Sequence, residues 1–178
     1  MISKEKKAEI IEKSTEYFKR ANIVITDKEK ANIEIADFGL NEIEKTGLEI
    51  LVYVNTERVC AKELVMLPNQ TCPEHRHPNI GGEPGKEETF RCRYGKVYLY
   101  VEGENTKNRK TNPPDAPEGS YTVFHEIELS PGEQYTLYPN TKHWFKSGGD
   151  GAVVSEFSTK SRDESDIFTD KRIIRIEE

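Results

Sequence analysis

Apolar and polar residues follow two different patterns along the chain. Residues 3 to about 20 predict an amphipathic helix, because apolar side chains recur at helical spacing while lysine and glutamate fill the other positions. Ser3 is suited to cap the amino end of this helix. We expect the helix to pack on the outside of the remaining structure. Its apolar positions are Ile10, Ile11, Tyr17 and Phe18.

From about residue 33 onward, short alternating or apolar runs separated by turn residues replace the helical pattern. Such runs are typical of strands, and their close spacing indicates an all-β barrel or sandwich. A polar stretch over 102–119, which contains Pro113 and Pro114, predicts a long surface loop. The predicted strands span 48–54, 59–67, 89–101, 121–129, 135–138 and 151–159, with 172–176 as a further edge strand.

Length and composition favour a small single-domain protein over a nucleic-acid-binding or membrane protein. The 178 residues suffice for one hydrophobic core, and no linker separates a second domain. With 26 basic and 32 acidic residues, the chain has no general attraction for phosphate backbones, so we do not expect nucleic acid as a partner. No apolar run approaches the roughly 20 residues that span a bilayer. The amino terminus lacks the apolar stretch of a signal peptide, so we expect a cytoplasmic protein without a membrane partner.

The cysteines give no sign of a disulfide framework. Cys60, Cys72 and Cys92 are odd in number, scattered and without a CxxC pair, so we expect reduced thiols. The same spacing argues against a structural zinc site with sulfur ligands.

Three of the four histidines suggest a metal site. His75 and His77 are two residues apart, and on an extended strand both side chains point to the same face and can reach one ion. His143 comes much later, behind a turn at Pro139 that would fix its position. The fourth histidine, His125, belongs neither to the pair at 75 and 77 nor to the turn before 143, and we expect a structural role for it.

A carboxylate near these histidines has three candidates. Glu87 and Glu88 are adjacent, so on a strand only one of them points inward. Glu83 lies in a glycine-rich stretch before them and is the third candidate. Strand geometry alone does not choose among the three.

The spacing of these residues resembles the two motifs of the cupin superfamily. The first motif has H-x-H, a glutamate, six residues and a glycine, and the chain has His75-Arg76-His77, Glu88 and Gly95. The spacer before the glutamate has ten residues where the family normally has three or four. The second motif is matched by 139–143, one residue short and without its glycine. The resemblance selects Glu88 as the carboxylate ligand beside His75, His77 and His143.

The same resemblance implies a fold. It implies a single cupin domain over 1–178, a double-stranded β-helix or jelly-roll barrel whose core spans about 45–160. The N-terminal helix (1–22) packs on this barrel, and 161–178 form a C-terminal extension. A homodimer is the default assembly for such barrels.

Within the cupins, the chain resembles the D-lyxose isomerase family. The long spacer, the sequence Lys86-Glu87-Glu88-Thr89-Phe90 and the later 153–159 carry this resemblance, which covers roughly 45–178 and is strongest at 68–104 and 129–160. It implies a metal-dependent isomerase of a free sugar, D-lyxose to D-xylulose, with D-mannose to D-fructose as a side activity. It also assigns two catalytic residues, Glu156 as the base and Lys86 as the cation near the oxygen where charge develops, and it places Lys86 in the substrate pocket.

Three imidazoles and one carboxylate define the chemistry that the site offers. The set suits Mn, Zn, Fe, Co or Ni, and we expect one Mn²⁺ per chain. An ion with open positions chelates the C1 and C2 oxygens of a sugar and stabilises an enediolate, while a base carries the proton. Glu156 would serve only if it points inward, since an outward carboxylate with Val153 and Phe157 on the core face fits the pattern as well. Phe90 and Trp144 are predicted sugar contacts, although filling the core is the simpler role for such aromatic residues.

Other functions remain open at this point. An iron-dependent cupin dioxygenase would use a similar site for oxygen, and a non-catalytic cupin would bind sugar without turnover. A phosphosugar isomerase would need a cluster of cations for the phosphate. The basic residues near the motifs are dispersed: Arg76, Lys86, Arg91, Arg93 and Lys142.

Overall fold

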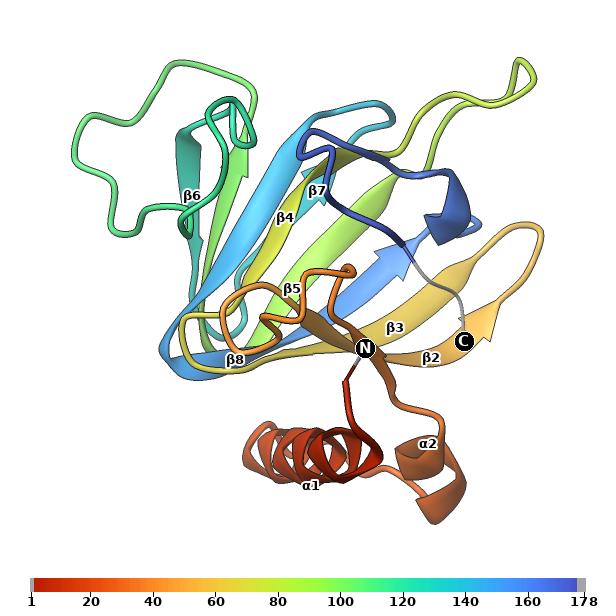
Figure 1. The fold of residues 1–178 in the computed structure, drawn as a ribbon. Coiled ribbons are helices and arrows are strands. Elements are labelled where there is room, and N and C mark those ends of the chain that lie inside the picture. Colours follow the sequence, from red (N-terminus) through yellow and green to blue (C-terminus); the bar gives the residue numbers. More distant parts are fainter. Residues whose placement is uncertain (1, 176–178) are drawn as a thin grey trace.

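The computed structural model describes residues 2–175 as a curled sheet with two helices below it (Figure 1). Helix α1 spans Lys4–Arg20 and α2 spans Asp27–Ala31. A short 3-10 helix, η1, spans Asp163–Ser165. The strands are β1 (Glu34–Ala36), β2 (Leu48–Asn55), β3 (Cys60–Met66), β4 (Thr71–Arg76), β5 (Glu88–Val101), β6 (His125–Leu129), β7 (Gln134–Leu137), β8 (His143–Ser158) and β9 (Ile167–Phe168).

Strands β5 and β8 form the spine of the sheet. They run antiparallel to each other along most of their length. The amino-terminal part of β8 also pairs with β4, and its carboxyl-terminal part pairs with β3. The strands follow the order β1-β2-β3-β8-β4-β9, and β5 carries β6 and β7. The predicted all-β fold with an N-terminal helix is therefore confirmed.

The backbone at Gly95, the glycine that ends the first motif with six residues between it and Glu88, has no room for a side chain. Its φ is +70°, and an added Cβ would lie 2.0 Å from the carbonyl oxygen of Gly151. The pairing of β5 with β8 is irregular on both sides of this residue. Only glycine fits where the backbones of the two long strands approach so closely, which lets both strands bend around the interior.

The two faces of the sheet bury different clusters. The concave face holds the main apolar core, which includes Leu64, Phe90 and Phe145. The outer face is covered in part by α1, whose Tyr17 and Phe18 pack on the outer side of β2, β3 and β8. Burying these rings drives the docking of the helix, since fully burying a large apolar side chain contributes about 1.5–3 kcal/mol.

The N-terminal helix agrees with its prediction. Ser3 caps α1, because its side chain accepts a hydrogen bond from the backbone N–H of Lys6 at 3.1 Å. Helix α2 was not predicted, although Thr26 and Glu29 form a reciprocal capping box that signals its start. Within residues 2–175 no helix has the length and apolar character that a membrane span requires.

Several strand limits differ from the prediction. Strand β6 begins only at His125, and β8 begins at His143, so the last residue of the second motif lies on the same strand as Glu156. The predicted edge strand over 172–176 was wrong for its described part, because 172–175 form no strand, while Ile176 lies outside the described residues. The C-terminal segment instead contributes β9, which pairs with β4 beside His75.

Candidate metal centre and active site

Two strands bring the three predicted histidines together inside the curled sheet. Strand β4 carries His75, and His77 follows directly after its last residue. His143 opens β8 and lies opposite His75 in the register of the two strands. All three side chains are buried, and one ring nitrogen from each lies within 4.8 Å of the others. The geometry is that of a metal site made by three imidazoles.

The second nitrogen of each ring fixes its tautomer. The Nδ1 of His75 lies 2.8 Å from the carbonyl oxygen of Pro73, and that of His143 lies 3.0 Å from the carbonyl oxygen of Thr141. Because a carbonyl only accepts, each Nδ1 carries the proton and each Nε2 presents a lone pair. The three Nε2 atoms are the inward-facing group, since Nδ1 of His77 is likewise bound to a carboxylate.

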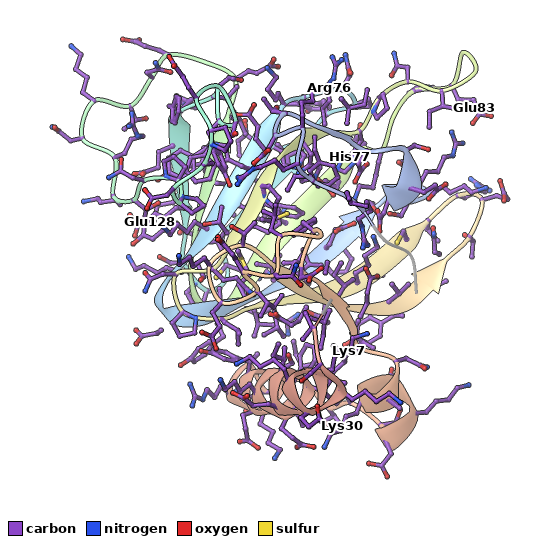
Figure 2. The ribbon with its side chains drawn as sticks, viewed as in Figure 1. Lys7, Lys30, Arg76, His77, Glu83 and Glu128 are labelled. Carbon is purple, nitrogen blue, oxygen red and sulfur yellow. The ribbon has the colours of Figure 1, made fainter. Side chains whose placement is uncertain are left out.

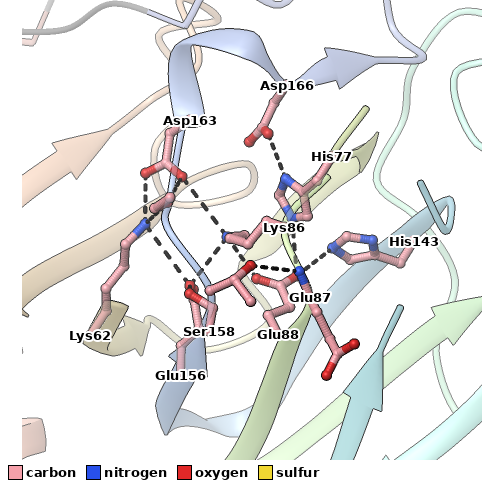
Figure 3. Close-up of polar contacts among 12 residues, drawn as sticks. Lys62, His77, Lys86, Glu87, Glu88, His143, Glu156, Ser158, Asp163 and Asp166 are labelled. Carbon is pink, nitrogen blue, oxygen red and sulfur yellow. Dashed lines mark hydrogen bonds and ion pairs between the residues drawn. The ribbon is translucent and has the colours of Figure 1, made fainter. Parts of the chain in front are cut away.

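That carboxylate belongs to Asp166, which the sequence did not single out. Its Oδ1 accepts a hydrogen bond from Nδ1 of His77 at 2.5 Å (Figure 3). A carboxylate in this position orients a histidine ligand and makes its other nitrogen more basic. Burial and Lys86 lower the pKa of His77, but Glu88 and Asp166 outweigh them and raise it to about 9. This part of the site therefore favours a positive charge.

Glu88 lies beside two of the imidazoles. Its Oε1 is 3.1 Å from Nε2 of His77 and 3.1 Å from Nε2 of His143. Despite this proximity, Nε2 of His143 has no hydrogen-bond partner. Lone pairs of the carboxylate and the imidazole that face each other without a donor repel, and a cation between them removes the repulsion. The donor set thus fits a bound metal ion.

The other two candidate carboxylates lie elsewhere. Glu87 is exposed, and its side chain points away from the imidazoles (Figure 3). Glu83 lies out on the long loop that leaves His77, at the far end from the site (Figure 2), where it forms an ion pair with Arg162. The structure places only Glu88 of the three next to the histidines.

Glu156 points into the interior, next to Lys86. Phe157 is 51% exposed on the outer face and Val153 is buried under α1, so the alternation along β8 turns Glu156 inward, at 4% exposure. Its Oε1 lies 3.1 Å from Nζ of Lys86, and the same Nζ lies 2.7 Å from Oε2 of Glu88. Lys86 thereby links the histidine cluster to the candidate base.

A second lysine lies on the far side of Glu156. Nζ of Lys62 is 2.7 Å from Oδ2 of Asp163 and 4.0 Å from Oε1 of Glu156. Burial raises the pKa of Asp163, but Lys86 and Lys62 outweigh it and hold that pKa below its usual range. Neither Lys62 nor Asp163 was predicted from the sequence, although a lysine between Cys60 and Leu64 on the inner face of β3 is unusual.

Carboxylates outnumber lysines around the histidines. The two lysines, Lys62 and Lys86, face four carboxylates, which are Glu88, Asp163, Asp166 and Glu156. With neutral imidazoles, and with the charge of Arg175 balanced by its ion pair with Glu34, this cluster carries a formal charge of −2. Burial, together with His143 and His77, holds the pKa of His75 well below its usual range, in keeping with a neutral ligand. A divalent cation balances such a cluster, because buried charge is costly unless it is compensated.

A small cavity connects these groups. It has a volume of about 40 Å³, enough for a few water molecules, and Phe90, Phe168 and Arg175 complete its wall. His77, Lys86 and Asp166 also border an outer cleft of about 430 Å³. The outer cleft has the size of small-molecule sites. The cleft and the cavity therefore share His77, Lys86 and Asp166 as a common wall.

Of the two predicted sugar contacts, Phe90 lines the cavity and Trp144 does not. Trp144 lies on the opposite face of β8 from its neighbour His143, because successive side chains alternate across a strand. Its ring stacks on Tyr100 at 3.9 Å between centroids, and its Nε1 donates to the carbonyl oxygen of Val123 at 2.8 Å. Trp144 therefore fills a separate core cluster.

The fourth histidine and the three cysteines lie outside the histidine cluster. His125 is half-buried on β6, and its Nδ1 lies 3.0 Å from the carbonyl oxygen of Glu104, away from the histidine cluster. Cys60, Cys72 and Cys92 are free and buried.

Comparison with known proteins agrees with this geometry. A family model described as D-lyxose isomerase matches residues 12–178. The chain is 67% identical to a D-lyxose/D-mannose isomerase of Thermosediminibacter oceani over 100% of this chain and 98% of that one. It is 58% identical to a D-lyxose ketol-isomerase of a Thermofilum species over 100% of this chain and 99% of that one.

A solved structure shares the fold at much lower identity. The ligand-free L-ribose isomerase of Cellulomonas parahominis superposes with a TM-score of 0.74 at 17% identity, covering 97% of this chain and 94% of that one. This likeness bears on the fold alone. The family match and the two relatives, which extend over nearly the whole sequence, show that the chain belongs to the D-lyxose isomerase family.

Proposed function

We propose that this protein is a metal-dependent aldose–ketose isomerase that interconverts D-lyxose and D-xylulose, with D-mannose and D-fructose as a side reaction. The observation that carries the proposal is one cavity bordered by His75 and His77 of the three-imidazole cluster and by the buried pair of Lys86 and Glu156. The names of the two relatives support the choice of sugar.

His75, His77, His143 and Glu88 would hold the metal. A divalent ion bound there would act as a Lewis acid, which polarises the sugar carbonyl and stabilises negative charge on the adjacent oxygens. Nitrogen and oxygen donors suit Mn²⁺, our first expectation, as well as Zn, Fe, Co or Ni. The homodimer and the cytoplasmic location stay predictions from the sequence.

Glu156 and Lys86 would carry out the proton transfer. Glu156 takes the proton from C2 of the open-chain aldose and returns it to C1, while the hydroxyl proton of O2 ends on O1. The two transfers together leave the composition and the overall oxidation level of the sugar unchanged. Lys86 donates a hydrogen bond to the oxygen on which charge develops. Phe90, which is 1% exposed and lines the cavity, keeps water away from the reacting carbons.

A panel of sugars tests this function. Metal-stripped protein, supplied with Mn²⁺ under nitrogen, is expected to convert D-lyxose to a ketose, because isomerisation consumes no oxygen. Product formation by chromatography and oxygen uptake in air are the two measurements, with phosphorylated aldoses as comparison substrates. Turnover that requires O₂ would favour the dioxygenase instead, and binding of sugar without turnover would favour a non-catalytic cupin.

A further inference from the structure

Lys62 is a buried cation for which the proposed mechanism has no use. On β3 its neighbours Ala61 and Glu63 face the outer side, while Lys62 faces the interior at 4% exposure. In the register of β3 with β8 it lies directly opposite Glu156. A lysine is almost never buried so fully without partners, so its contacts define its role.

Two of the three donors of this lysine are occupied. Its Nζ donates to Oγ of Ser161 at 2.8 Å and to Oδ2 of Asp163 at 2.7 Å, both from the C-terminal segment. Burial lowers the pKa of Lys62, but Glu156 and Asp163 raise it by more, and the ammonium stays charged. The third donor has only Glu156 near it, at 4.0 Å.

Glu156 therefore lies between two ammonium groups. Figure 3 shows Lys86 on one side of its carboxylate and Lys62 on the other. Ser158 supplies one more hydrogen bond to the same Oε1 at 3.2 Å. Engagement of a sugar oxygen by Lys86 would lengthen its contact with Glu156, and a buried carboxylate needs a nearby counter-ion to hold its position.

We propose that Lys62, anchored by Asp163, is a positioning residue that holds the carboxylate of Glu156 in place while Lys86 engages the sugar. This inference rests on the proposed function, since it assigns Lys62 a task in the same reaction. Lys62 needs only a small shift to close the 4.0 Å gap to a hydrogen bond. The anchor at Asp163 limits that shift and keeps the lysine away from the metal ligands.

The test compares Lys62→Met, Lys62→Arg and the double variant Lys62→Met with Asp163→Asn, each loaded with Mn²⁺. In Lys62→Met we expect kcat for D-lyxose to fall about 10- to 100-fold with KM and metal content nearly unchanged, because the loss falls on the proton-transfer step. Lys62→Arg keeps the charge and should recover part of kcat. Lys96→Met is the matched control, since it removes a lysine whose ion pair with Glu128 lies outside the site.

The double variant shows whether Lys62 positions Glu156 or only balances the charge of Asp163. It leaves no unpaired carboxylate at 163, so it should fold even if Lys62→Met does not, and its kcat should stay low. Wild-type kcat in the folded Lys62→Met or in the double variant would overturn the proposal. A wild-type protein that turns over none of the sugars would contradict the proposed function itself, so the two failures are distinguishable.

Discussion

Replacing His75 or His143 with alanine is expected to remove the bound metal and the isomerase turnover together. Each substitution deletes one of three converging Nε2 donors, and the remaining ligands hold the ion much more weakly. We expect metal content to fall well below the wild-type value and kcat/KM to drop by at least about 10³-fold, the scale on which loss of a central catalytic group acts. Elemental analysis of the purified variant, together with a D-lyxose assay, measures both quantities.

Glu87→Ala is the matched control for Glu88→Ala. Glu87 is exposed and Glu88 is 1% exposed beside the imidazoles, so only the second change should reduce metal binding. A thermal melt shows whether each variant is folded. If His143→Ala kept the full metal content, the shared site would be wrong, and a reversed result for the two glutamates would show that the ligand lies on the other strand face.

Glu156→Gln is expected to keep metal and sugar binding but to lose most of kcat, on the order of 10²-fold or more, since acid–base catalysis typically contributes that much. The amide has nearly the same shape but cannot accept the C2 proton. Steady-state kinetics give kcat and KM, and the wild-type reaction in D₂O should place deuterium at C1 or C2.

Two outcomes would remove Glu156 from the mechanism. Turnover close to that of the wild type in Glu156→Gln would show that another group carries the proton. Absence of deuterium from both substrate and product would favour a hydride shift between C2 and C1, which needs no base at this position.

The histidine cluster was largely predictable from the sequence. Side chains two residues apart on a strand share a face, and this rule brought His75 and His77 together without any knowledge of the fold. The place of Glu88 followed from its spacing to Gly95, and the structure gives the physical reason, which is the close approach of Gly95 to Gly151. Local geometry therefore accounts for His75 and His77, whereas the choice of Glu88 came from the resemblance to the cupin motif.

The supporting residues were not predictable, because they depend on contacts between distant parts of the chain. Asp163 and Asp166 reach the site only because the C-terminal segment folds back and pairs with β4. No periodicity encodes that pairing. Lys62 did carry a local sign, a charged residue in an apolar strand, yet its partners lie about a hundred positions away.

Trp144 shows that being next to a metal ligand in the sequence does not place a side chain in the site. It follows a predicted metal ligand directly, and proximity along the chain suggested proximity to the sugar. The alternation of side chains along β8 instead turns it to the other face, where it stacks on Tyr100. The same alternation placed Glu156 inside, so the strand limits, once known, settle both residues.

A titration of the metal-stripped protein with Mn²⁺, in which bound metal and D-lyxose turnover are followed together, tests the metal dependence of the reaction. We expect no turnover without metal, and activity that rises in proportion to bound ion and levels off at one equivalent per chain, as a single site of three imidazoles and one carboxylate requires. Full turnover by the metal-free protein, or one tightly bound ion that leaves the protein inactive toward every aldose, would contradict this expectation.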